Sequence, residues 1–92
     1  MIILAEVVND IVTVNQRLQH FEKKYGILSS EFYQTFNKGE LAEFDGDEIY
    51  HDEFMAWAAL YQTQQKLYRE YQRMSVEQPV AARIRSRLAF AA

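Results

Sequence analysis

Few side chains in this sequence could do acid–base or metal chemistry. The two histidines, His20 and His51, stand far apart, and neither has a carboxylate or a second histidine four residues further on, the spacing at which a helical face presents two metal ligands. There is no cysteine, which excludes a thiolate metal site and a cysteine nucleophile. We therefore expect no enzymatic activity, no cofactor and no metal, and we interpret both histidines as ordinary surface or interface residues.

An acidic stretch lies near the middle of the chain. Residues 40–53 include seven carboxylates and no Lys or Arg. Asp45 and Asp47 have the spacing of calcium ligands, but Gly46 lies between them, whereas an EF-hand loop places its glycine after the third ligand. We interpret the stretch as a solvated acidic turn. The alternative is that Asp45, Asp47 and Glu48 form a surface that steers a basic protein partner.

Aromatic side chains are more numerous than a chain of 92 residues can easily bury. There are six tyrosines, six phenylalanines and one tryptophan. Aromatics at helical spacing are typical of a core, yet tyrosine and tryptophan are also the side chains that anchor protein interfaces. Both roles stay open for this set. The residues that we expect to anchor a protein partner are Trp57, Tyr61, Tyr68 and Tyr71.

Three arginines, Arg83, Arg85 and Arg87, make the end of the chain basic. Residues 1–75 carry seven Lys or Arg against twelve Asp or Glu, a net charge of −5, whereas residues 76–92 carry three arginines against one glutamate, a net charge of +2. Three arginines are few for a phosphate-binding surface, so we do not expect a nucleic-acid partner. The arginines either solubilise a terminal helix or dock it, through Arg83 and Arg87, on an acidic surface of the same chain, its twin or a partner.

The element that carries the first apolar residues is predicted to be a long helix. Apolar positions recur at alternating intervals of three and four residues up to Gly26, which predicts a helix with one apolar seam. A short strand at the start is the alternative, since the first residues are rich in β-branched side chains, but apolar and polar residues do not alternate there. The seam consists of Leu4, Val7, Ile11, Val14, Leu18, Phe21 and Tyr25.

Two more helices are predicted in the body of the chain. A short one lies between Gly26 and Gly39, with Ser29 or Ser30 as its N-cap, and it is too short to be stable unless it packs. A long one runs from about Asp52, its expected N-cap, to Met74. Its wide apolar face can contact two neighbours at once.

The tail, residues 76–92, differs from the body in pattern as well as in charge. Pro79 suits the start of a new helix. A strand is the alternative, because apolar residues alternate with arginines over residues 82–90, but the alanine content favours a helix. We divide the chain into residues 1–75, a helical hairpin domain, and the basic amphipathic tail. The expected apolar stripe of the tail helix is Val80, Ile84 and Leu88.

The fold class that these elements predict is all-α. We expect an antiparallel hairpin of two long helices, with the short helix crossing its closed end. The core of such a hairpin is thin for a monomer, which favours a homo-oligomer, in the form of a dimeric bundle. No apolar stretch reaches the roughly 18 residues that span a bilayer, and no basic region precedes the opening apolar run, so we expect a cytoplasmic protein without a membrane partner.

Several short motifs between residues 18 and 74 resemble those of a known family. They are Glu22-Lys23-Lys24-Tyr25-Gly26, Ser29-Ser30-Glu31-Phe32-Tyr33 with Phe36, Lys38-Gly39-Glu40-Leu41, an acidic linker, and Phe54-x-x-Trp57-x-x-Leu60-Tyr61. The family consists of small helical proteins of bacteria and archaea, some of which are predicted antitoxins.

The resemblance implies a helical hairpin that sequesters a small toxin, often a ribonuclease-like protein, and that has no activity of its own. This chain departs from the family pattern in a longer linker, which contains Phe44, Ile49 and Tyr50, and in its arginine-bearing tail. The alternative function is a homo-oligomeric coiled-coil scaffold or adaptor.

Overall fold

The computed structural model describes residues 3–91, and this part of the chain is all-helical. The elements are α1 (Leu4–Tyr25), α2 (Ser29–Asn37), the 3₁₀ turn η1 (Ala42–Phe44), α3 (Glu48–Ser75) and α4 (Val80–Ala91). None of these helices is long and apolar enough to span a membrane. The all-α prediction is therefore confirmed over the described residues.

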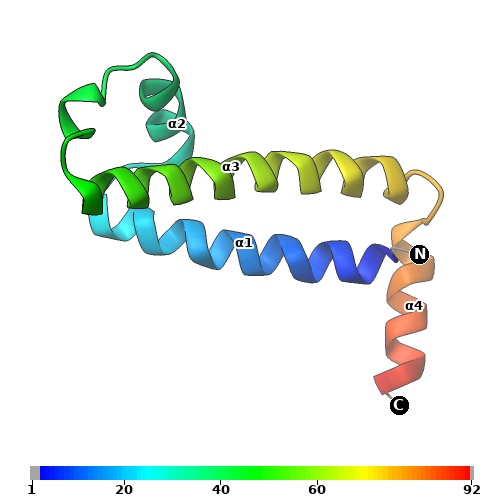
Figure 1. Ribbon diagram of the computed structural model, residues 1–92. Helices are drawn as coiled ribbons and strands as arrows, with labels where there is room; N and C mark the ends of the chain where they lie inside the picture. The colour runs from blue at the N-terminus through cyan, green and yellow to red at the C-terminus, as the bar shows by residue number, and fades with distance from the viewer. Residues whose placement is uncertain (1–2, 92) are drawn as a thin grey trace.

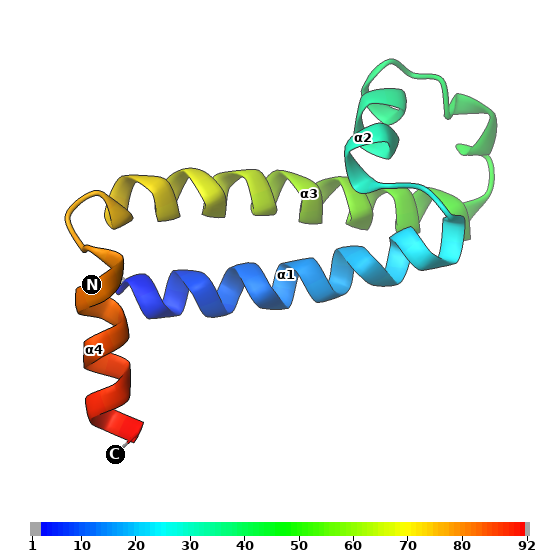
Figure 2. The ribbon, with the colours of Figure 1, turned by 180° about the vertical axis from the view of Figure 1, so that it is seen from behind.

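The two long helices set the shape of the molecule. α1 and α3 lie side by side and run in opposite directions (Figure 1). α2 and η1 cover the start of α3 at one end, which we call the closed end, and α4 projects across the other end, which we call the open end (Figure 2). The overall dimensions are 54 × 24 × 23 Å. The two ends of this rod are therefore far apart.

α1 follows the predicted apolar seam. Leu4, Val7, Val14 and Leu18 of that seam are buried. The helix ends at Tyr25 and is capped by Gly26, whose φ of 70° lies in the left-handed region and whose N–H donates to the Glu22 carbonyl at 2.8 Å. The helix begins at Leu4, so the alternative of a strand at the start is wrong from that residue on.

The N-caps differ from those predicted. α3 begins at Glu48 rather than near Asp52, because Asp47 Oδ1 accepts hydrogen bonds from the backbone N–H groups of Ile49 at 3.0 Å and Tyr50 at 3.3 Å. Part of the expected acidic linker is therefore helix. In α2 the N-cap position is held by Leu28, which makes no side-chain cap, and Ser29 is buried instead.

The largest buried cluster lies toward the closed end, and Leu4 and Val7 are buried separately at the start of α1. Trp57 is fully buried, and its ring lies parallel to that of Phe32, with the centroids 3.9 Å apart. The rings of Phe21 and Tyr25 also stack near Trp57, at 5.5 and 5.6 Å. Aromatic packing thus holds α1, α2 and α3 together at this end. The buried cluster consists of Val14, Leu18, Phe32, Phe54, Trp57 and Ala58.

The tail forms the helix α4, so the alternative of a strand is wrong for residues 80–91. Arg83 fixes the start of α4. Its Nη1 donates to Tyr71 Oη of α3 at 3.1 Å, and its Nε donates to the Gln78 carbonyl at 2.9 Å. The apolar stripe of α4 remains more than half exposed at Val80, Ile84 and Leu88.

Candidate protein-binding surfaces

The residues predicted to bind a partner do not form one surface. Asp45, Asp47 and Glu48 lie at the closed end, before and at the start of α3. Arg83 and Arg87 lie in α4 at the open end, and the four aromatic residues are spread along α3 between the two. The molecule therefore has two separate candidate surfaces, one acidic and one basic.

Trp57 belongs to the core, so its expected role as a partner anchor must be corrected. Its side chain is 0% exposed. The indole Nε1 donates to Ser29 Oγ at 2.8 Å, and Ser29 Oγ in turn donates to Glu22 Oε2 at 2.8 Å. This chain of bonds satisfies the indole N–H inside the protein, as burial requires.

The three tyrosines on α3 differ in what they offer to a partner. Tyr61 is half-buried, and its ring lies 4.9 Å from that of Tyr33 in α2. Tyr71 is half-buried and holds Arg83 through its hydroxyl and through its ring, whose centroid lies 5.6 Å from the guanidinium carbon. Tyr68 is exposed. Tyr68 is therefore the most exposed of the three, and its hydroxyl accepts hydrogen bonds from Asn15 Nδ2 of α1 and from Gln64 Nε2, both at 3.4 Å.

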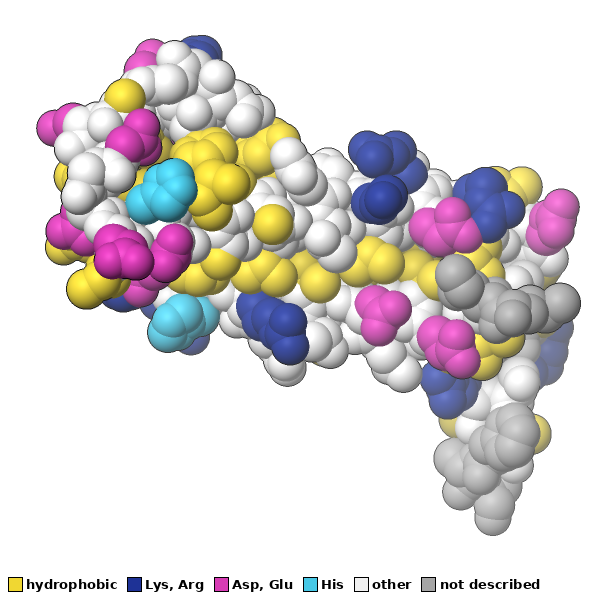
Figure 3. Space-filling model, in the orientation of Figure 1, with side chains coloured by type: hydrophobic (Ala, Val, Ile, Leu, Met, Phe, Trp, Pro, Cys, Tyr) yellow, Lys and Arg dark blue, Asp and Glu magenta, His cyan; other side chains and the backbone are white. Residues whose placement is uncertain are grey.

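The acidic residues have distinct roles. Asp47 caps α3, which is a structural role. Asp45 is exposed and lies 3.9 Å from His51 Nδ1. Among residues 3–91, no three His, Cys, Asp or Glu side chains are grouped as a metal site would need. Figure 3 shows a group of acidic side chains around the closed end, with others further along the rod toward the open end.

Sequence reasoning missed an apolar component at the closed end. Ile49 and Met55 are 70% and 51% exposed on the outer side of α3. On a helical projection these two residues lie at the edges of a strip of α3 that has the exposed carboxylates of Glu48 and Asp52 between them. We call these four residues the acidic face. Ile49 was expected in the linker, because the long helix was predicted to begin only near Asp52, and Met55 lies outside the apolar face predicted for that helix.

A polar contact fixes the end of α1 against α3. The Glu53 carboxylate accepts hydrogen bonds from Lys24 Nζ and from Tyr25 Oη. The bond from Lys24, followed by that from Tyr25, lowers the pKa of Glu53. Burial, helped by the bond to Glu53, raises the pKa of Tyr25 to about 12. The two groups with shifted pKa values, Glu53 and Tyr25, are thus bonded to each other, and their bond joins the end of α1 to α3.

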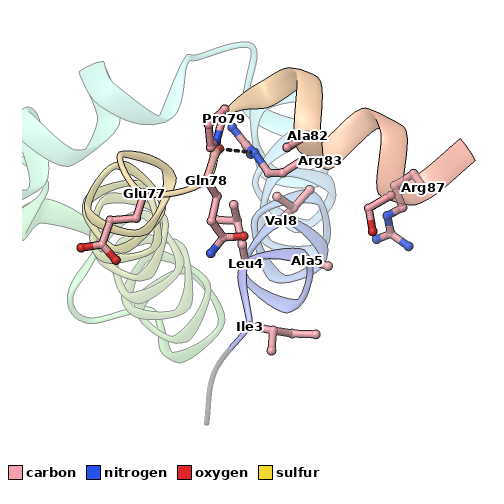
Figure 4. A pocket seen from close by; sticks show the side chains of 11 residues that line it. Ile3, Leu4, Ala5, Val8, Glu77, Gln78, Pro79, Ala82, Arg83 and Arg87 are labelled. Carbon is pink, nitrogen blue, oxygen red and sulfur yellow. Dashed lines mark hydrogen bonds between the residues drawn. The ribbon is translucent and has the colours of Figure 1, made fainter. Parts of the chain in front are cut away.

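The open end contains a groove between the start of α1 and α4 (Figure 4). Its volume is about 550 Å³. We call it the open-end groove. Its walls combine apolar side chains from both helices with charged groups from α4 and the connection before it. The apolar residues include Ile3, Ala5, Val8 and Ala82, and the charged residues are Glu77, Arg83 and Arg87.

Several of the residues that carry the family resemblance make hydrogen bonds between the helices of this molecule. Glu22, Ser29 and Trp57 form the buried bond chain, and Lys24 and Tyr25 hold Glu53. Comparison of the chain with protein-family models, with curated proteins and with solved structures found no match.

Proposed function

We propose that this chain is a non-catalytic protein-binding module whose open-end groove receives a helix of its partner. One observation carries the proposal: two helices present apolar side chains to each other across a space that the described residues leave open. Ile3 and Val8 on the α1 side are 51% and 38% exposed. An amphipathic helix laid in an apolar groove is a common mode of protein recognition.

The charges beside the groove indicate which helix would fit. Arg87 is exposed on the α4 side of the groove, where it can pair with a carboxylate. Arg83 on the same side is already bonded to Tyr71 and Gln78. A helix with an apolar face and an adjacent acidic residue therefore suits the groove.

The family resemblance suggests the form that this binding takes, in which the partner is a small toxin that the module sequesters. The closed end supports such a role for a partner that is basic overall. Residues 22–53 carry nine Asp or Glu against three Lys, a net charge of −6. A field of one sign speeds association and orients the partner more than it adds affinity.

The test is co-expression with the product of the adjacent reading frame, using two neighbouring variants. Ala82→Glu places a carboxylate in the groove, whereas Ala81→Glu, its matched control, lies outside the groove lining. Both changes fall in the first turn of α4, where the helix dipole favours a carboxylate, so neither should unfold α4. We expect Ala82→Glu to weaken partner binding at least about tenfold, or roughly 1.4 kcal/mol, and Ala81→Glu to leave binding unchanged.

Two outcomes contradict the proposal. One is a partner that binds Ala82→Glu as tightly as it binds the parent chain. The other is an adjacent product that neither co-purifies with this chain nor causes a growth defect that this chain relieves.

A further inference from the structure

The outer side of α4 is a second surface, which shares only Arg83 and Arg87 with the lining of the open-end groove. Val80, Ile84 and Leu88 are 60%, 54% and 63% exposed there, and with Tyr71 they line a hollow of about 270 Å³. These three residues recur at intervals of four, so they form one stripe along α4. On a helical projection Arg87 borders one side of the stripe and Arg85 the other. The outer side of α4 is therefore an apolar stripe between basic residues.

The acidic face has the complementary character. Its apolar residues, Ile49 and Met55, are exposed, and its charged residues, Glu48 and Asp52, are carboxylates. The two faces therefore carry opposite charges, and each also offers exposed apolar side chains. On α4 the arginines flank the apolar stripe, whereas on the acidic face the carboxylates lie between Met55 and Ile49.

The net charges of the two ends of the molecule also have opposite signs. The closed end, residues 22–53, has a net charge of −6. The open end, made of residues 4–10 and 66–91, carries six Lys or Arg against four Asp or Glu, a net charge of +2. Because the faces lie at opposite ends of a rod 54 Å long, one molecule cannot bring its own two faces together.

We propose that a second copy of this chain covers the outer side of α4. The two copies align antiparallel, and α4 of each copy packs on the acidic face of the other. Twofold symmetry makes the two contacts identical, so both form at once and the assembly closes. A single contact of this kind would leave a free face at each end and would build an open fibre.

The size of the contact also favours the closed dimer. A stable protein interface buries about 800 Å² on each partner, which is much for one helix of 12 residues. In the reciprocal dimer each copy buries both its α4 and its acidic face, so the total buried area is twice that of a single contact. This inference does not depend on the proposed function, because the apolar stripe that carries it is not part of the lining of the open-end groove and its test measures self-association alone.

The experiment is a charge exchange, read by sedimentation equilibrium of the full-length chain at low ionic strength. One variant, Arg85→Glu with Arg87→Glu, reverses the basic side. The other, Glu48→Lys with Asp52→Lys, reverses the acidic face. Each variant alone then meets its own charge, and its dimer dissociation constant should rise at least about tenfold.

A mixture of the two variants restores opposite charges at both contacts, so it should form a heterodimer of the two. A matched control, Arg17→Glu with Lys23→Glu, also reverses two exposed charges but lies on α1, outside both faces, and should remain a dimer. Circular dichroism checks that each variant keeps its helices.

The proposal is overturned if the parent chain remains a monomer at several hundred micromolar, which would leave the face to an acidic helix of another protein. It is also overturned if the folded variants dimerise as tightly as the parent chain, or if their mixture stays monomeric.

Discussion

At the scale of single residues, polar groups lock the aromatic packing at the closed end. Trp57 donates its indole N–H to Ser29, and Ser29 is bonded to Glu22 through both its hydroxyl and its backbone N–H. These bonds link α1, α2 and α3 at one point. Serine at the start of a helix is usually an N-cap, and this is the role that the sequence predicted for Ser29 or Ser30. The burial of Ser29 between Glu22 and Trp57 was therefore not predictable.

Ser29→Ala should therefore destabilise the protein. Removing the hydroxyl leaves the buried Trp57 N–H without a partner, a loss of about 1–3 kcal/mol in the free energy of unfolding. Ser30→Ala, on the exposed neighbour, is the matched control and should change stability by less than about 0.5 kcal/mol. Urea denaturation of both variants measures the difference. Equal stabilities would show that the bond to Ser29 adds nothing.

Tyr25 predicts a loss of stability in alkaline solution. Burial and the bond to Glu53 raise its pKa from the ordinary 10.0 to about 12 in the folded chain. The folded state then holds its proton at a pH where the unfolded state releases it. This contribution to stability is fully present below pH 10 and is lost as the pH rises from 10 to about 12.

Tyr25→Phe removes this titration. The free energy of unfolding of the parent chain should therefore fall more steeply between pH 10 and about 12 than that of the variant. Thermal or chemical melts of both proteins across this range provide the measurement. Parallel curves would mean that Tyr25 titrates alike in the folded and unfolded chains.

At the scale of elements, apolar spacing predicted the helices well and their ends less well. The seam of α1 is a repeated signal over six turns, and its buried residues follow it. Helix ends depend on one or two side chains, and here two aspartates, Asp47 and Asp52, competed for the start of α3. The position of α4 was not predictable, because it depends on Arg83 meeting Tyr71 across the connection.

Arg83 should therefore control the order of α4. A helix of 12 residues is marginal in water unless something holds it, and Arg83 bonds both α3 and the turn before α4. We expect Arg83→Ala to speed backbone hydrogen exchange in α4 while the amides of α1 and α3 keep their protection. Arg85→Ala removes the same charge without these bonds and should leave exchange unchanged. Exchange measured by mass spectrometry on peptides of α4, at concentrations that keep the chain monomeric, distinguishes the two.

At the scale of the whole molecule, the largest buried cluster and the exposed apolar stripe of α4 lie toward opposite ends. The buried aromatic cluster joins α1, α2 and α3 toward the closed end, whereas α4 stands at the open end with its apolar stripe exposed. The sequence predicted that apolar side chains would remain for another chain. It could not show where, because the aromatic residues that looked most suited to an interface, Trp57 above all, are those that best fill a core.

This division predicts that α4 is dispensable for folding. In dilute solution, deletion of residues 79–92 should lower the melting temperature by less than about 4 °C, which corresponds to less than roughly 1 kcal/mol in a domain of this size. Leu18→Ala, in the buried cluster, should lose about 2–5 kcal/mol and melt well below the deleted chain, because it opens a cavity that its neighbours cannot fill.

Protein concentration then separates folding from assembly in the same measurement. If α4 joins two copies, the melting temperature of the full-length chain should rise with protein concentration, since dimerisation stabilises the folded state by mass action. The deleted chain lacks the basic side of the contact, so its melting temperature should stay constant over the same range. A deleted chain that melts as low as Leu18→Ala in dilute solution would instead make α4 part of the cooperative core, because its loss would then weaken the folded monomer itself.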